Sequence, residues 1–147
     1  MSKVYIVVDF DGTVVEHKFP GVGEPVPGAI DTLKRFQDKG YLIILNTMRS
    51  YKNNKPPTFP GENMIIDALT PAVSFFKDYG INLYGINNNP DQNSWTNSPK
   101  VYGHFYIDDT AAGCPLIYPE DGRPYVNWIE IEKDIEIKIS RGWVKSH

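Results

Sequence analysis

The feature that most constrains the fold is an apolar run near the N-terminus that ends in two carboxylates. Val4–Val8 is β-branched or aromatic at every position and shows no polar alternation. Such a run is typical of a strand buried on both faces inside a parallel α/β sheet. Asp9 and Asp11 follow directly, and Gly12 lets the backbone turn sharply after them. Because ligands of open α/β sheets bind beyond the carboxyl ends of the strands, these carboxylates are expected at a functional site.

Two carboxylates this close repel each other unless a cation lies between them or one takes a proton. Mg²⁺ prefers oxygen ligands, uses one or two protein carboxylates and completes its shell with water and substrate phosphate. The pair therefore predicts a magnesium site. The alternative is an ordinary turn after a strand, since Asp and Gly are common turn residues.

Helical and apolar segments alternate through the first half of the chain. Residues 27–40 carry apolar side chains at helical spacing, and residues 41–45 form a second continuous apolar run. A helical stripe is expected over residues 64–79, with a kink or break near Thr70 because Pro71 follows. This alternation of strands and helices predicts an α/β fold with a mainly parallel sheet.

The second half is expected to add two strands and a final helix. Residues 81–86 and 104–107 are short apolar runs. Asn127 can cap a helix over residues 128–139, with Glu130 reaching back to it, although the isoleucines alternating with charged residues also fit a strand. We favour the helix. The stretch before it is expected to be irregular.

Three loops are expected near the mouth of the site, where they narrow the entrance: residues 14–24, 51–61 and 87–99. The first of them carries His17, which we expect to be a solvated side chain, as histidines in loops commonly are.

Length and composition indicate one globular domain over residues 1–147, with 41% apolar and 22% charged residues. The only cysteine, Cys114, excludes an intrachain disulfide and fits a reducing, cytoplasmic setting. No segment is long enough for a signal peptide or a membrane span, so no membrane association is expected. The formal charge of −3 gives no electrostatic reason to expect stable nucleic-acid binding, although a nucleic-acid end stays open as a substrate.

Polar side chains near the ends of the expected strands form a series that resembles the haloacid dehalogenase-like hydrolases, most of which are phosphatases that form an aspartyl-phosphate. Asp9-Phe10-Asp11-Gly12-Thr13 matches the first motif of that family residue by residue. The other three motifs are matched, in the family's order, by Thr47, Lys100 and the pair Asp108-Asp109.

The resemblance implies a three-layer Rossmann-like sandwich and a Mg²⁺-dependent phosphatase that hydrolyses a phosphate monoester. Asp9 would be the covalent nucleophile, and Asp11 the general acid and base. Mg²⁺ would be held by Asp9, Asp108 and the backbone carbonyl of Asp11. Asp109 would orient Lys100 or the waters on the metal, and Gly12 supports the turn.

The transferring phosphoryl group needs donors and positive charge around it. Thr47 would donate a hydrogen bond to a phosphoryl oxygen, and Lys100 would neutralise the charge on the group. Arg49, close to Thr47, is expected to attract the anionic substrate. An alternative for all three is an ordinary turn hydroxyl and two solvated surface charges.

The spacing between the motifs leaves no room for a lid domain, so the sequence resembles a capless member of the family. An open site suits a phosphorylated small molecule or macromolecule, or it is covered by the partner in a homo-oligomer. Two other functions remain open. One is a phosphoacceptor domain of the receiver type, although in receivers the lysine follows the acidic residues; the other is a non-catalytic phosphate-binding domain.

Overall fold

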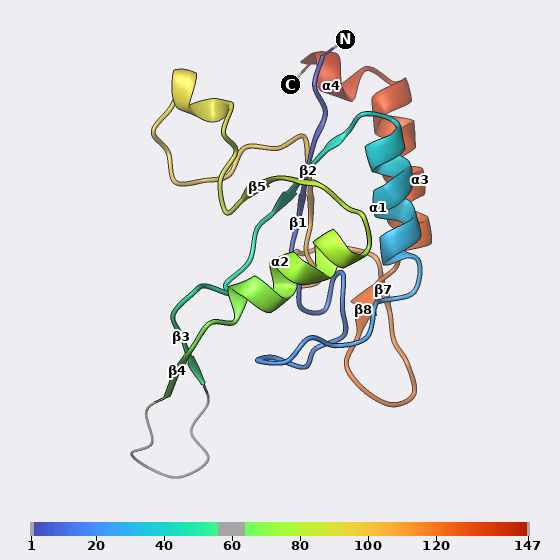
Figure 1. Ribbon diagram of the computed structural model, residues 1–147. Coiled ribbons are helices and arrows are strands. Elements are labelled where there is room, and N and C mark those ends of the chain that lie inside the picture. The colour runs from blue at the N-terminus through green and yellow to red at the C-terminus, as the bar shows by residue number, and fades with distance from the viewer. Residues whose placement is uncertain (1, 56–63, 147) are drawn as a thin grey trace.

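A parallel four-stranded sheet forms the centre of the computed structural model, which describes residues 2–55 and 64–146 (Figure 1). The strand order is β5-β2-β1-β6, and all three neighbouring pairs are parallel. The strands are β1 (Tyr5–Val8), β2 (Leu42–Leu45), β5 (Leu83–Ile86) and β6 (Phe105–Ile107). The α/β fold with a parallel central sheet, predicted from the four apolar runs, is therefore confirmed.

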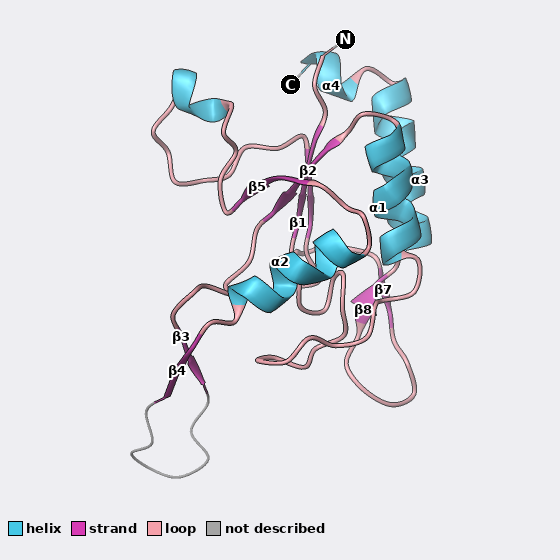
Figure 2. Ribbon diagram, in the orientation of Figure 1, coloured by secondary structure: helices cyan, strands magenta, loops and turns pink. Residues whose placement is uncertain are grey.

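Within the described residues, four α-helices accompany the sheet (Figure 2): α1 (Ala29–Asp38), α2 (Leu69–Asp78), α3 (Trp128–Ser140) and the short α4 (Trp143–Ser146). The helix expected over residues 128–139 is confirmed as α3. Asn127 caps it as expected, since its Oδ1 accepts a hydrogen bond from the Glu130 amide at 3.3 Å. The Glu130 carboxylate does not complete the reciprocal cap but accepts from Lys133. None of the helices in the described parts has the length and apolarity needed to cross a bilayer.

The three longer helices pack on one face of the sheet. Their buried side chains form a single core with the strand residues that point to that face, among them Ile6, Ile43 and Phe105. The other face is covered by the connection from β5 to β6, whose Val101 packs against Val7 and Ile44. Figure 1 shows α1 and α3 on one side of the strands and this connection on the other.

The expected third layer is therefore not helical. Within the described residues, the connection contains only a 3₁₀ turn, η1 (Gln92–Ser94), and it begins with Asn87-Asn88-Asn89-Pro90. Asparagine hydrogen-bonds to its own backbone and proline lacks an amide hydrogen, so this segment is poorly suited to a helix. The prediction of a three-layer sandwich is correct for the sheet and one helical layer only.

The helix expected over residues 64–79 is wrong in its first part. Met64–Ile66 is a strand, β4, which pairs antiparallel with β3 (Asn53–Lys55) inside the expected loop 51–61. Asp67 Oδ1 accepts hydrogen bonds from the Leu69 and Thr70 amides, so the helix begins only there, and Pro71 then lies in its first turn, where a missing amide hydrogen costs little. The rest of the expected loop, from residue 56 on, lies outside the described residues.

A second small hairpin lies where an irregular stretch was expected. β7 (Leu116–Ile117) pairs antiparallel with β8 (Tyr125–Val126). Two hydrogen bonds fix its position: the Asn127 amide donates to the Pro115 carbonyl at 2.9 Å, and Trp128 Nε1 donates to the Thr13 carbonyl at 2.8 Å. The second bond joins the hairpin to the turn that follows β1.

Candidate functional site

The carboxyl ends of β1 and β6 lie side by side, where the order of the strands reverses. From β1 the chain adds β2 and β5 on one side, and it then crosses to place β6 on the other side of β1. The Asp9 amide donates to the Ile107 carbonyl at 2.9 Å, so the pairing continues to the first acidic residue. Such a reversal point is the usual ligand site of an open α/β sheet.

Three carboxylates gather there. One oxygen atom from each of Asp9, Asp108 and Asp109 lies within 4.8 Å of the other two. Buried Thr13 joins the two segments, because its hydroxyl donates to Asp9 Oδ2 at 3.0 Å and accepts from the Asp109 amide at 3.1 Å. Asp108 Oδ1 accepts from the amide and hydroxyl of Thr110 at 2.9 and 2.8 Å. Sequence motifs almost 100 residues apart thus meet at one point.

The environment of Asp9 disfavours its ionised form. The pKa of Asp9 is raised to about 7, mainly by burial and then by the nearby Asp108 carboxylate, while the Thr13 hydrogen bond acts in the opposite direction. A divalent cation would remove this penalty, since it favours the ionised form of each carboxylate. Carboxylate oxygens are the donors that Mg²⁺ prefers, so the residues present fit the predicted ion.

Asp109 and His17 form a pair that the sequence did not predict. His17 Nε2 lies 2.9 Å from Asp109 Oδ2, and the imidazole is half-buried rather than solvated. The expected contact of Asp109 with Lys100 is not present; its carboxylate joins the cluster instead. The turn at Gly12, whose amide donates to the Val15 carbonyl at 2.7 Å, folds the chain back and so brings His17 to the site.

Asp11 and Arg49 also take positions that differ from the prediction. Arg49 is 1% exposed, and its Nε and Nη2 donate to the two oxygens of the Asp11 carboxylate at 2.9 and 2.8 Å. Its other three N–H groups donate to the backbone carbonyls of Pro20, Gly21 and Ala68. All five donors of the guanidinium are therefore used, so Arg49 holds Asp11 and is not available to bind a substrate as predicted.

Thr47 lies at the expected edge of the sheet. The amide of Asn46 donates to the Val8 carbonyl at 2.8 Å, which places the residue after it beside the end of β1. The Thr47 hydroxyl accepts from the Arg49 amide at 3.1 Å and the Thr47 amide donates to Asn87 Oδ1 at 2.7 Å. Because its oxygen serves as the acceptor in this turn, the hydroxyl hydrogen can point toward a ligand.

Lys100 is not brought into contact with the acidic cluster. It lies in the connection over the other face of the sheet, with its Nζ 5.5 Å from the centre of the Tyr106 ring. It lines a separate hollow with Trp95 and Tyr106, which contains none of the acidic residues. Beyond Asn87, which contacts Thr47, the loop 87–99 lies away from the acidic cluster, since its Asp91 contacts Tyr5 and Lys3 near the start of β1.

We expect Gly12→Ala to destabilise the protein strongly. Gly12 has φ +83°, and a Cβ atom there would clash with His17 Nε2 and Asp109 Oδ2. Gly40 is the matched control because it has φ +84° but open space around it. Gly40→Ala should cost roughly 1–2 kcal/mol, the cost of the left-handed backbone alone. Chemical denaturation of both variants measures the difference; equal losses would mean that the His17–Asp109 pair moves aside freely.

Comparison with known proteins gives a fold but no activity. No protein family matches the chain, and no curated protein matches it. Among solved structures, it is similar to a conserved protein from Bacteroides thetaiotaomicron, with a TM-score of 0.65 and 28% sequence identity over 93% of each chain. The description of that protein states no activity. The similarity therefore supports the α/β architecture along nearly the whole chain, and the function has to be argued from the site.

Proposed function

We propose that this protein is a Mg²⁺-dependent phosphatase of the haloacid dehalogenase-like type, which forms an aspartyl-phosphate on Asp9. The observation that carries the proposal is the meeting of Asp9, Asp108 and Asp109 within 4.8 Å at the point where the strand order reverses. Three carboxylates at a ligand-binding edge, with the pKa of Asp9 raised to about 7, make a site that suits a divalent cation.

In the proposed reaction, a carboxylate oxygen of Asp9 attacks phosphorus, and the bond to the ester oxygen breaks. Water then hydrolyses the acyl phosphate and regenerates the carboxylate. A bound Mg²⁺ supplies the positive charge that lets an anionic nucleophile approach an anionic phosphate. Thr13 orients Asp9 through its 3.0 Å hydrogen bond, and Thr47 donates to a phosphoryl oxygen.

Asp11 is proposed as the acid and base, as the family resemblance implies. To give a proton to the leaving oxygen, its carboxyl group has to release at least one of its two hydrogen bonds to Arg49. Lys100 would neutralise charge on the phosphoryl group only after its side chain turns away from the Tyr106 ring. These two movements are part of the proposed catalytic cycle.

A second candidate is a phosphoacceptor domain that is phosphorylated on Asp9 but releases phosphate slowly. The pairing of Asp11 with Arg49 favours this candidate, because a carboxylate held in two charge-assisted hydrogen bonds is less free to activate water. The two candidates share the first chemical step and differ only in the second.

Phosphate release from p-nitrophenyl phosphate tests both. We expect steady turnover with Mg²⁺, loss of activity with a chelator and recovery when Mg²⁺ is restored, because the cluster needs a cation to accept an anionic substrate. Release that stops after one phosphate per chain would support the phosphoacceptor. No release and no phosphorylation, at any Mg²⁺ concentration, would contradict both.

A further inference from the structure

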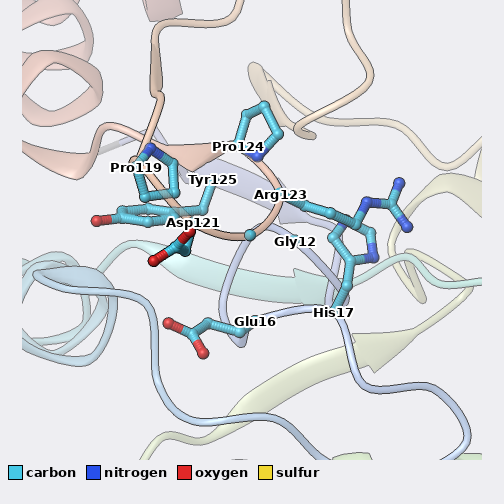
Figure 3. A pocket seen from close by; sticks show the side chains of 9 residues that line it. Gly12, Glu16, His17, Pro119, Asp121, Arg123, Pro124 and Tyr125 are labelled. Atoms are coloured by element: carbon cyan, nitrogen blue, oxygen red, sulfur yellow. The ribbon is translucent and has the colours of Figure 1, made fainter.

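A hollow of about 330 Å³ opens beside the carboxylate cluster, between the turn after β1 and the β7–β8 hairpin (Figure 3). Gly12 and His17 form the wall nearest the cluster, and His17 contacts Asp109 directly. A phosphate ester whose phosphoryl group lies at Asp9 therefore has this hollow next to it. The volume is at the lower end of the range found for small-molecule sites, about 300–1,000 Å³.

The opposite wall of the hollow is anchored to the site. It comes from the hairpin and the loop that joins its strands, and it includes Tyr125 and Arg123. Tyr125 pairs with Ile117 in the hairpin, and the next residue, Val126, is fully buried. Since Trp128 Nε1 bonds to the Thr13 carbonyl, the wall keeps a fixed position relative to Asp9.

Charged groups of both signs line the hollow. Glu16, Asp121 and Arg123 are exposed, and none of the three side chains has an ion-pair partner among the residues that the structure describes. In Figure 3 the two carboxylates lie on one side of the view, with His17 and Arg123 on the other. The carboxylates can only accept hydrogen bonds and the guanidinium can only donate them.

We propose that this hollow binds the leaving group of the phosphate ester, and that the leaving group is a sugar or another polyol. The inference rests on the proposed phosphatase function. Hydroxyl groups donate and accept, so a polyol satisfies Glu16, Asp121 and Arg123 together. The Tyr125 ring and the prolines offer an apolar surface for the C–H face of a sugar.

Other leaving groups fit the hollow less well. An acidic group on the substrate would face the carboxylates of Glu16 and Asp121, which repel it. A nucleobase binds best between flat apolar surfaces, and Tyr125 is the only Phe, Tyr or Trp among the described residues of this lining. A peptide would extend beyond so small a space.

A panel of phosphate esters with different leaving groups tests which class of leaving group the hollow prefers. With Mg²⁺ present, we expect kcat/KM for glucose 6-phosphate to exceed that for a nucleoside 5′-monophosphate and for a phosphotyrosine peptide by at least about tenfold, as expected when one ligand leaves charged groups unpaired. A preference for the nucleotide or the peptide would overturn the proposal and leave the phosphatase function standing.

Arg123→Ala tests whether the guanidinium in the wall of the hollow binds the leaving group. The ratio of kcat/KM for glucose 6-phosphate to that for p-nitrophenyl phosphate should fall roughly 10- to 100-fold, the usual effect of losing a hydrogen bond to a charged group. Arg141→Ala is the matched control, because Arg141 is an exposed arginine just after α3 and lies outside this hollow. Equal ratios in the two variants would exclude Arg123 from the site.

A binding measurement keeps this inference separate from the catalytic one. Calorimetric titration of the Mg²⁺-loaded protein with glucose 6-phosphate should show saturable binding that Arg123→Ala weakens and Arg141→Ala does not. If the protein binds the sugar phosphate in this way but hydrolyses nothing, the hollow is correctly assigned and the phosphatase proposal is wrong. If it hydrolyses p-nitrophenyl phosphate but binds no sugar phosphate, the reverse holds.

Discussion

Asp9→Asn is expected to abolish phosphatase activity while making the metal-free protein more stable at pH 8. The loss of activity should be on the order of 10⁴-fold or more, since the amide cannot act as the covalent nucleophile. The gain in stability follows from electrostatics, because the substitution removes a half-buried charge that lies close to Asp108. Each kcal/mol gained should raise the melting temperature by roughly 2–4 °C.

The same variant gives a pH dependence with a definite sign. The pKa of Asp9 rises from its ordinary value of 3.8 to about 7 on folding, so the folded protein binds a proton that the unfolded chain releases. Its contribution to stability is therefore present at low pH and lost as the pH rises through about 7. Thermal unfolding without metal should show a clear advantage for Asp9→Asn at pH 8 and little at pH 4, because the stability is lost between about 3.8 and about 7.

Two controls make this result specific. Asp78→Asn removes an exposed carboxylate at the end of α2 and should change neither activity nor the pH dependence. Added Mg²⁺ should stabilise the wild-type protein more than Asp9→Asn, because the ion binds the folded state through the carboxylate that the variant lacks. Full phosphatase activity in Asp9→Asn would show that another residue is the nucleophile.

The acidic strand ends could be predicted because a local pattern marks each of them. In a parallel sheet, the residues that follow each strand meet at one edge, so finding the strands before Asp9 and Asp108 was enough to bring these side chains together. The final helix was predictable for a similar reason, since Asn127 and its cap lie within one turn of each other. In both cases the pattern that marks each strand end or cap lies within a few neighbouring residues.

The errors arose where distant contacts decide the structure. Ile65 and Ile66 fit the helical spacing of Leu69, and only the pairing with β3 shows that they form a strand. The absence of a helix from the β5–β6 connection depends on the strand order, which places that segment over Val7 and Ile44. Spacing along the chain carries little information about either contact.

Arg49 is the clearest case of this kind. It was predicted to attract the substrate because it is positively charged and lies close to Thr47 in the sequence. Its actual partners lie 19 to 38 residues away along the chain, at Asp11, Pro20, Gly21 and Ala68. No local pattern distinguishes an arginine that awaits an anion from one whose five donors are already used.

Arg49→Met is expected to be among the most destabilising single substitutions in the chain. It leaves the Asp11 carboxylate, which is 18% exposed, without its cation, and it removes the donors to three backbone carbonyls. Breaking a buried pair by removing one partner costs roughly 3–5 kcal/mol. Chemical denaturation should show this loss, and Arg49→Lys should recover only part of it, because an ammonium cannot reproduce the two-pronged contact.

Arg35→Met is the matched control. Arg35 makes an equally short two-pronged contact with Glu132, at 2.8 and 2.9 Å, but it is 51% exposed. A surface pair of this kind contributes about 0–1 kcal/mol, so the two variants differ mainly in burial. Combining Asp11→Asn with Arg49→Met should restore part of the lost stability, since the stranded charge is then gone. Equal losses in Arg35→Met and Arg49→Met would mean that burial adds nothing to the Asp11 pair, so that its release during catalysis would cost little free energy.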